Sequence, residues 1–158
     1  MVIETIGKIW KQLSPSLRTW VTRRTQHKFT ASVAAIITND RGEVLLLNHV
    51  FRPSSGWGLP GGFIGPGEQP ETALKRELAE ETGIELQDFS LYRARTLRRH
   101  IEFIFLATSS GEAKVKSREI TDLGWFAIDD MPAEMNLDQQ FLIRKALPSA
   151  PTKISGHR

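Results

Sequence analysis

The chain has 158 residues, 40% hydrophobic and 25% charged, a composition typical of one globular domain and unlike collagen-like, disordered or disulfide-framework proteins. It contains no cysteine, which excludes disulfides, thiolate metal sites and a cysteine nucleophile and suits a reducing compartment. The net charge of +3 is uneven, because residues 1–28 carry +5 and the remaining chain carries −2. No apolar run approaches the ~18 residues of a membrane span, and no secretory signal pattern opens the chain. We therefore expect a cytoplasmic protein.

The first 28 residues predict a basic, amphipathic helical extension. Apolar residues recur at helical spacing on both sides of Ser14-Pro15. Serine is a favoured N-cap and proline suits the first helical position, so we expect two short helices that meet there. Because Trp10 and Trp20 carry large apolar surfaces, we expect them to pack against the domain or a second subunit, which makes a homodimer conceivable. The alternative is contact of residues 1–25 with a membrane surface, which the proline break disfavours.

The rest of the chain predicts an α+β domain. Strands are expected at 29–38, 43–50, 89–96, 99–108 and 123–128, and helices at 70–82, 129–135 and 137–147. The strands and helices do not alternate steadily, which favours a mixed-sheet sandwich over a doubly wound parallel sheet. We divide the chain into the extension (1–28), the domain (29–148) and a polar, flexible tail (149–158).

Three carboxylates lie on one face of the helix expected at 70–82. Glu77, Glu80 and Glu81 have the spacing i, i+3 and i+4, which places them within about 100° of one another around the helix. Like charges at this spacing repel, and a divalent cation would offset the repulsion. Oxygen ligands with no nearby histidine or cysteine favour Mg²⁺ or Mn²⁺ over zinc. The simpler interpretation is a solvated acidic face in which Arg76 pairs with Glu80.

The residues around these glutamates form a longer pattern that resembles the box of the Nudix hydrolases. The pattern is Gly, five residues, Glu, seven residues, Arg-Glu-aliphatic, one residue, Glu-Glu, one residue, Gly-aliphatic. It is matched without departure by Gly62, Glu68, Arg76, Glu77, Leu78, Glu80, Glu81, Gly83 and Ile84. Seven such identities would arise by chance in about one window in a billion. The resemblance therefore outweighs the interpretation as a solvated face.

The resemblance implies a fold and a set of residue roles. The fold is an α/β/α sandwich around a mixed sheet, with the box as a loop–helix–loop, and the reaction is hydrolysis of a nucleoside diphosphate linked to another moiety. By similarity to the family, Glu77 and Glu81 are the principal Mg²⁺ ligands, and Glu80 and the Gly62 carbonyl are further ligands. Arg76 is similar to the arginine that orients the carboxylates. Glu68 is similar to the first box glutamate, which positions the helix.

The attacking group and its base are expected from chemistry and spacing. There is no cysteine, and no serine lies beside a histidine in a recognisable nucleophile motif, so water is the expected attacker. Glu119 lies six residues before Trp125, a spacing similar to that of a glutamate found outside the box in this family. It is a candidate metal ligand or general base. The alternative for Glu119 is a surface glutamate at the entry to a strand.

The sequence offers candidate substrate contacts without naming the substrate. Arg52, Arg98, Arg99 and His100 are candidate phosphate contacts, because cationic side chains bind phosphate and guanidinium groups do so bidentately. Arg98 and Arg99 are more often solvated as neighbours on a strand. Phe51 and Trp57 could stack on a base or close a loop over the core. His100 stands where relatives acting on ADP-ribose often have proline, and Tyr92 falls too early for the tyrosine of dinucleoside polyphosphate hydrolases. His100 has no partner histidine at metal spacing.

These observations lead to one main functional expectation and two alternatives. The main one is Mg²⁺-dependent hydrolysis of a phosphoanhydride bond in a nucleoside diphosphate derivative, such as a nucleotide sugar or a nucleoside triphosphate, with no specific nucleic-acid partner. One alternative is a nucleotide-sensing module that has lost catalysis, which usually shows an eroded box. The other is processing of RNA 5′ ends, which the basic extension permits.

Overall fold

A mixed β-sheet forms the centre of the molecule. The computed structural model describes residues 2–52, 55–86, 88–109 and 111–147. Its strands are β1 (Thr30–Thr38), β2 (Val44–His49), β3 (Trp57–Gly58), β4 (Asp88–Leu97), β5 (His100–Thr108) and β6 (Ile120–Phe126). The strand order is β3-β2-β1-β5-β4, and β6 also pairs with β2. β1 and β5 are parallel, whereas the other pairs are antiparallel.

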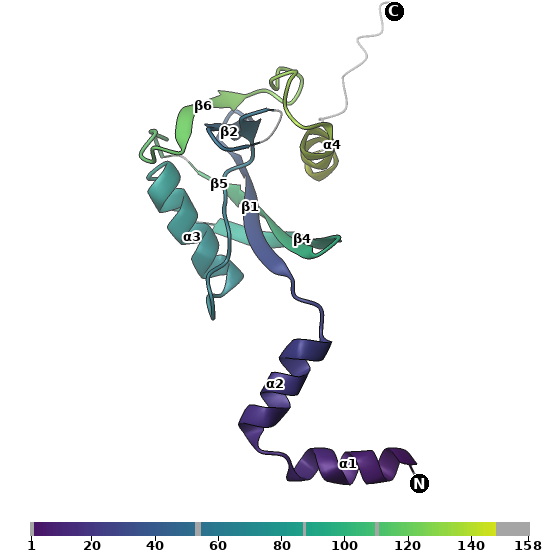
Figure 1. Cartoon of the computed structure of the whole chain (residues 1–158). Helices are drawn as coiled ribbons and strands as arrows, with labels where there is room; N and C mark the ends of the chain where they lie inside the picture. Colours follow the sequence, from purple (N-terminus) through teal and green to yellow (C-terminus); the bar gives the residue numbers. More distant parts are fainter. Residues whose placement is uncertain (1, 53–54, 87, 110, 148–158) are drawn as a thin grey trace, which may run out of the picture.

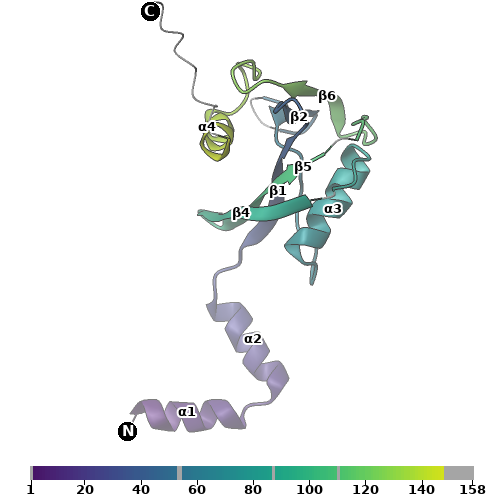
Figure 2. The same cartoon turned by 180° about the vertical axis from the view of Figure 1, so that it is seen from behind.

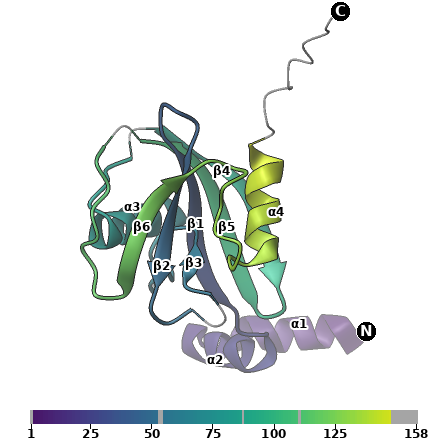
Figure 3. The same cartoon turned by 90° about the horizontal axis from the view of Figure 1, so that it is seen from above.

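One helix covers each face of this sheet. Helix α3 (Pro70–Glu81) lies on one face and α4 (Leu137–Ala146) on the other, as Figure 3 shows from above. Along β1 the side chains alternate between the two cores: Val33 and Ile37 pack on the α3 side, whereas Ile36 packs on the α4 side. Because both faces of β1 and β2 are covered, both strands are nearly continuous apolar runs. The expected α/β/α sandwich is confirmed.

The Nudix-type box forms the expected loop–helix–loop. A loop from Gly62 to Gln69 leads into α3, which begins with Pro70, and Gly83 follows the helix with φ +72°. Leu74 and Leu78 point from α3 into the core and are fully buried. Their burial fixes how the helix is rotated, and so determines which of its glutamates face the preceding loop.

One predicted helix is absent, and one predicted strand begins earlier. Residues 129–135 form successive turns, with hydrogen bonds from the Asp130 N–H to the Ala127 carbonyl and from the Met135 N–H to the Pro132 carbonyl, both at 3.0 Å. Met131 and Met135 are buried at a spacing that imitates a helix, but Pro132 cannot supply an N–H within one. The last strand begins at Ile120 rather than at residue 123, because its first residues pair with the end of β2.

The N-terminal extension consists of two helices that stand apart from the domain. They are α1 (Val2–Gln12) and α2 (Pro15–Thr25), and Figures 1 and 2 show them leading away from the start of β1. The predicted junction is confirmed: the Ser14 hydroxyl accepts a hydrogen bond from the Leu17 N–H at 3.3 Å, and Pro15 begins α2.

The expected packing of this extension against the domain is not seen. Neither α1 nor α2 has a buried residue, and Trp10 and Trp20 remain 38% and 56% exposed. The reason is geometric, because α2 continues away from the sheet instead of folding back over it (Figure 1). No helix in the described part of the chain is long and apolar enough to cross a membrane. The tail expected at 149–158 lies outside the described residues.

Candidate active site

The site is built where α3 meets the loop from Pro60 to Gly62. This loop is fastened to β1 by two hydrogen bonds, from the Val33 N–H to the Gly62 carbonyl at 2.9 Å and from the Ala35 N–H to the Pro60 carbonyl at 3.1 Å. Gly61 has φ +141°, and a Cβ there would lie 2.2 Å from the Val33 carbonyl oxygen. Only glycine allows this close approach of the loop to the strand.

Glu77 and Glu81 project from α3 against this loop. The Gly61 N–H donates a hydrogen bond to Glu81 Oε2 at 3.1 Å. A Cβ at Gly62 would lie 2.3 Å from the carboxyl carbon of Glu77, so the space above this glycine is occupied by the carboxylate. The Gly62 carbonyl already accepts the bond from Val33, which leaves one of its two lone pairs for another partner.

Arg76 ties the loop to the helix through several hydrogen bonds. Its Nε and Nη2 donate to the two oxygens of Glu68 at 2.9 and 3.0 Å, its Nη1 donates to Glu77 at 2.8 Å, and its Nη2 also reaches the Phe63 carbonyl at 3.1 Å. Glu68 accepts a further bond from the Gly65 N–H at 2.8 Å. The bonds from Arg76 and then Gly65 lower the pKa of Glu68 to about 2, and those to Glu68 and Glu77 raise the pKa of Arg76.

Glu80 lies apart from its two neighbours. Its side chain is 61% exposed, and its carboxylate is 3.7 Å from Arg76 Nη1. The three carboxylates therefore do not converge as the helical spacing predicted, because Glu77 and Glu81 face the loop whereas Glu80 faces solvent. Among the residues that the structure describes, no three carboxylate or imidazole side chains lie close enough together to enclose a metal ion.

The electrostatics around Glu81 nevertheless suit a cation. Burial is the largest influence and raises the pKa of Glu81 to about 7; the Gly61 hydrogen bond opposes this, and the negative charges of Glu77 and Glu119 add to it. The positively charged side chains nearby thus do not neutralise these carboxylates. Oxygen donors in such an arrangement fit Mg²⁺ or Mn²⁺.

A cleft of about 360 Å³ opens beside these carboxylates. Its lining includes five of the residues singled out from the sequence, namely Arg52, Gly62, Glu77, His100 and Glu119. Arg52 donates from Nη2 to the Leu59 carbonyl at 2.7 Å, while its Nη1 is buried with no partner among the described residues. Burial lowers the pKa of Arg52, and the carboxylates of Glu81 and Glu102 oppose this shift. An unused buried donor on a cationic group favours an anionic ligand here.

The cleft also contains three residues that the sequence did not single out. His49, Glu102 and Gln139 line it, together with His100, whose ring nitrogens lie 2.7 Å from the Thr30 hydroxyl and 2.8 Å from the Ser32 hydroxyl. Burial, followed by the charge of Arg52, lowers the pKa of His49 to about 4, so its ring is neutral beside Glu81. His49, Glu102 and Gln139 come from three different elements, β2, β5 and α4, so no local spacing could have revealed them.

Four candidate substrate residues lie outside the lining of the cleft. Phe51 is 79% exposed, and Trp57 packs edge-on against Phe126 with ring centroids 5.1 Å apart. Trp57 therefore closes the loop over the core, which was the alternative interpretation of this residue. Arg98 and Arg99 form the exposed turn between β4 and β5, and Arg98 has φ +57°.

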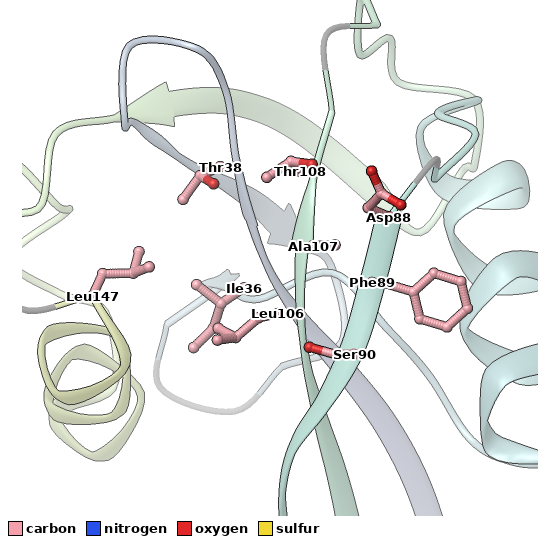
Figure 4. Close-up of a pocket in the computed structure, with 9 residues that line it drawn as sticks. All are labelled: Ile36, Thr38, Asp88, Phe89, Ser90, Leu106, Ala107, Thr108 and Leu147. Atoms are coloured by element: carbon pink, nitrogen blue, oxygen red, sulfur yellow. The ribbon is translucent and has the colours of Figure 1, made fainter.

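A second hollow of about 410 Å³ lies elsewhere on the domain (Figure 4). It is formed by β1, β4 and β5 and by Leu147, and it shares no residue with the cleft. Its nine lining residues include one carboxylate, Asp88, and no basic side chain. Of these two hollows, only the smaller cleft beside α3 combines carboxylates with a basic side chain, as phosphate and metal binding require.

Known proteins are similar to this chain over most of the domain. The family model described as the NUDIX domain matches residues 28–146. A MutT-like protein of Streptomyces ambofaciens is 30% identical over 131 residues, which are 81% of this chain and 83% of that protein. An RNA pyrophosphohydrolase of Pseudomonas fluorescens is 43% identical, but over only 63 residues, 40% of this chain and 38% of the relative.

A solved structure agrees over nearly the whole domain. The MutT NUDIX hydrolase from Burkholderia pseudomallei superimposes with a TM-score of 0.66 at 31% identity, covering 75% of this chain and 98% of that structure. The family match over residues 28–146 and the similarity in sequence and fold lead to one conclusion: the chain belongs to the NUDIX family of hydrolases.

Proposed function

We propose that this protein hydrolyses a phosphoanhydride bond in a nucleoside diphosphate derivative, such as a nucleotide sugar or a nucleoside triphosphate. One observation carries the proposal: the carboxylates of Glu77 and Glu119 share a cleft with Arg52, whose buried Nη1 has no partner among the described residues. Carboxylates suit a divalent cation and a guanidinium suits a phosphate. Such a cleft has the two kinds of group that a phosphoanhydride substrate requires.

The residues of the box would hold Mg²⁺, or Mn²⁺ in its place. Glu77, Glu81 and the free lone pair of the Gly62 carbonyl are the proposed ligands, and Glu80 would reach the ion by rotating its exposed side chain. When bound, the cation neutralises charge on the phosphates and makes a coordinated water more acidic. Arg76 acts as a positioning residue, because it holds Glu77 and Glu68 in place without lining the cleft.

Glu119 is the proposed acceptor of the proton from the attacking water. It lines the cleft from the turn just before β6, it is exposed, and its charge acts on Glu81. The water oxygen forms a bond to phosphorus, the anhydride oxygen leaves with the bonding electron pair, and Glu119 takes the proton. Arg52 would bind the charge on the phosphate that does not react.

A panel of nucleotide substrates tests this function. The purified full chain is incubated with Mg²⁺ and nucleoside triphosphates, nucleotide sugars and dinucleoside polyphosphates, and products are separated by chromatography. Water labelled with ¹⁸O identifies the phosphorus that is attacked. We expect Mg²⁺-dependent turnover of at least one class, abolished by Glu77→Gln. No hydrolysis of any phosphoanhydride, with nucleotide binding retained, would instead support a sensing module.

RNA 5′-end processing is a second candidate, favoured by the similarity to RNA pyrophosphohydrolases over 63 residues and by the +5 charge of residues 1–28. A triphosphorylated RNA oligonucleotide assayed beside the matching free nucleoside triphosphate distinguishes the two. Preference for the RNA, with activity falling steeply as salt rises, would support RNA processing. Activity on the free nucleotide that is insensitive to salt would support the first proposal.

A further inference from the structure

Helix α1 carries an apolar face that no other described residue buries. At 100° per residue, its apolar side chains fall within an arc of about 120°. They are Val2, Ile3, Ile6, Ile9 and Trp10, continued by Leu13 just beyond the helix. The first five are between 38% and 84% exposed. A surface of this kind on a helix indicates a missing partner.

The proline break does not interrupt this face. Helix α1 ends at Gln12, and the whole apolar arc is complete before Ser14-Pro15. Helix α2 does not extend the arc. Viewed down its axis, Arg24 falls between Leu17 and Trp20, and its guanidinium packs over the Trp20 ring, 5.4 Å from the centroid. The objection raised by the sequence, that two interrupted helices make a poor continuous face, therefore does not apply to α1 alone.

The charge around the apolar face identifies the kind of partner. Residues 1–28 contain six basic side chains and a single acidic one: Lys8, Lys11, Arg18, Arg23, Arg24 and Lys28, against Glu4. A second copy of the chain would bring the same positive charge to the interface, which disfavours self-association through this face. An RNA would match the charge but offers no apolar surface for the valine and isoleucines. An anionic lipid surface matches both properties.

We propose that α1 is an interfacial helix that lies on anionic phospholipid membranes, with its valine, isoleucine and tryptophan side chains in the headgroup region. The basic residues of α2 add electrostatic attraction close to the bilayer. Figures 1 and 2 show α1 at the end of the molecule, apart from the sheet, α3 and α4. The NUDIX domain would therefore remain in water with its cleft open, and membrane binding does not depend on the substrate assigned above.

Co-sedimentation of the full chain with vesicles tests this proposal. Vesicles of phosphatidylcholine alone are compared with vesicles containing 30% phosphatidylglycerol (a roughly one-third anionic surface). We expect binding at least about tenfold stronger to the anionic vesicles, and weaker binding as salt rises. The variant Ile6→Ser/Ile9→Ser should bind them about tenfold more weakly, because apolar surface is lost from the centre and edge of the arc.

A matched control separates the apolar face from helix stability. Gln12→Ser changes the same helix on its polar face and should bind as the parent does, and circular dichroism compares the folds of both variants. Ile6 and Ile9 are 60% and 56% exposed, so their replacement should leave melting and nucleotide hydrolysis unchanged. Equal binding of the Ile6→Ser/Ile9→Ser variant would overturn the proposal. So would a dimer in light scattering that this variant dissociates, or binding of RNA in place of vesicles.

Discussion

At the scale of single residues, two adjacent glycines have different tasks. Gly61 lets the loop approach β1, since a Cβ there would collide with the Val33 carbonyl oxygen at 2.2 Å in a backbone conformation of φ +141°. Gly62 leaves room for a side chain, because a Cβ there would collide with the Glu77 carboxylate. A collision with backbone disturbs the fold, whereas a collision with the end of a flexible side chain moves only that side chain.

This contrast predicts that alanine mainly lowers stability at Gly61 and mainly lowers activity at Gly62. Gly61→Ala should lower the free energy of unfolding by about 2 kcal/mol, because the strained backbone and the clash with Val33 cannot both be relieved. Gly62→Ala should melt near the parent but lose about 10²-fold in kcat, because the Glu77 carboxylate is displaced. Urea denaturation and steady-state kinetics on both variants provide the check. Full activity in Gly62→Ala would show that the position of Glu77 does not matter.

The two loop-facing glutamates should be essential for catalysis. Glu77→Gln and Glu81→Gln should each lose at least about 10²-fold in kcat with a smaller change in KM, because charge stabilisation is realised mainly in the transition state. Their folds should persist, since removing a carboxylate relieves repulsion between the pair. Kinetics over a range of Mg²⁺ concentrations measures both effects. Near-parental turnover in Glu77→Gln would exclude it as a metal ligand.

At the scale of elements, the box works as one unit because the loop and the helix are joined by Arg76. The guanidinium bridges Glu68 in the loop and Glu77 in α3, while Leu74 and Leu78 anchor the opposite side of the helix in the core. The carboxylates are thus held from two directions. Rotation of α3 is resisted by packing, and movement of the loop is resisted by the ion pair.

The Glu68–Arg76 pair should make stability depend on acid pH. The pKa of Glu68 is lowered from 4.5 to about 2, so the pair stabilises the fold above about pH 4.5, and this contribution disappears as the pH falls toward 2. Glu68→Gln should therefore be less stable than the parent at neutral pH and equally stable near pH 2. Thermal melts of both proteins between pH 2 and 7 measure the difference, and a constant gap across that range would contradict the assignment.

The packing of α3 predicts a clear difference between buried and exposed leucines. Leu78→Ala should lower the free energy of unfolding by about 3 kcal/mol, because the side chain is fully buried against the sheet. Leu137→Ala in α4 is the control: this side chain is 77% exposed, and the change should stay within about 0.5 kcal/mol. Chemical denaturation compares the two. Similar losses in both variants would place Leu78 outside the core.

At the scale of the whole molecule, the chain consists of a catalytic domain and a separate helical extension. The cleft is lined only by residues from Ser32 onward, whereas residues before β1 contribute no buried side chain. The two parts are therefore separable: the proposed hydrolysis belongs to the domain, and the proposed membrane attachment belongs to the extension.

Deletion of residues 1–25 should leave Mg²⁺-dependent hydrolysis within about twofold of the parent, because no group at the site is lost. The melting temperature should change little, since α1 and α2 bury nothing. Kinetics and calorimetry of the truncated protein measure these outcomes. A large loss of activity on free nucleotides would mean that the extension contributes to the site.

Some properties of this protein follow from the sequence alone, because they depend on local spacing. Residues close together in the chain set the box, the rotation of α3 that buries Leu74 and Leu78, the two-helix extension with its break at Ser14, and the strands β1 and β2.

Other properties depended on the tertiary structure. Gln139 lies 80 residues from Leu59, yet its side chain accepts the Leu59 N–H at 3.2 Å, and His49 lies beside Glu81 only because β2 ends there. Trp57 and Phe51, similar from the sequence, differ because one packs on Phe126 and the other faces solvent. The turns at 129–135 and the uncovered face of α1 were likewise decided by tertiary packing. Helical spacing shows which residues share a face, but the physical reason for burial or exposure is whether another part of the molecule lies against that face.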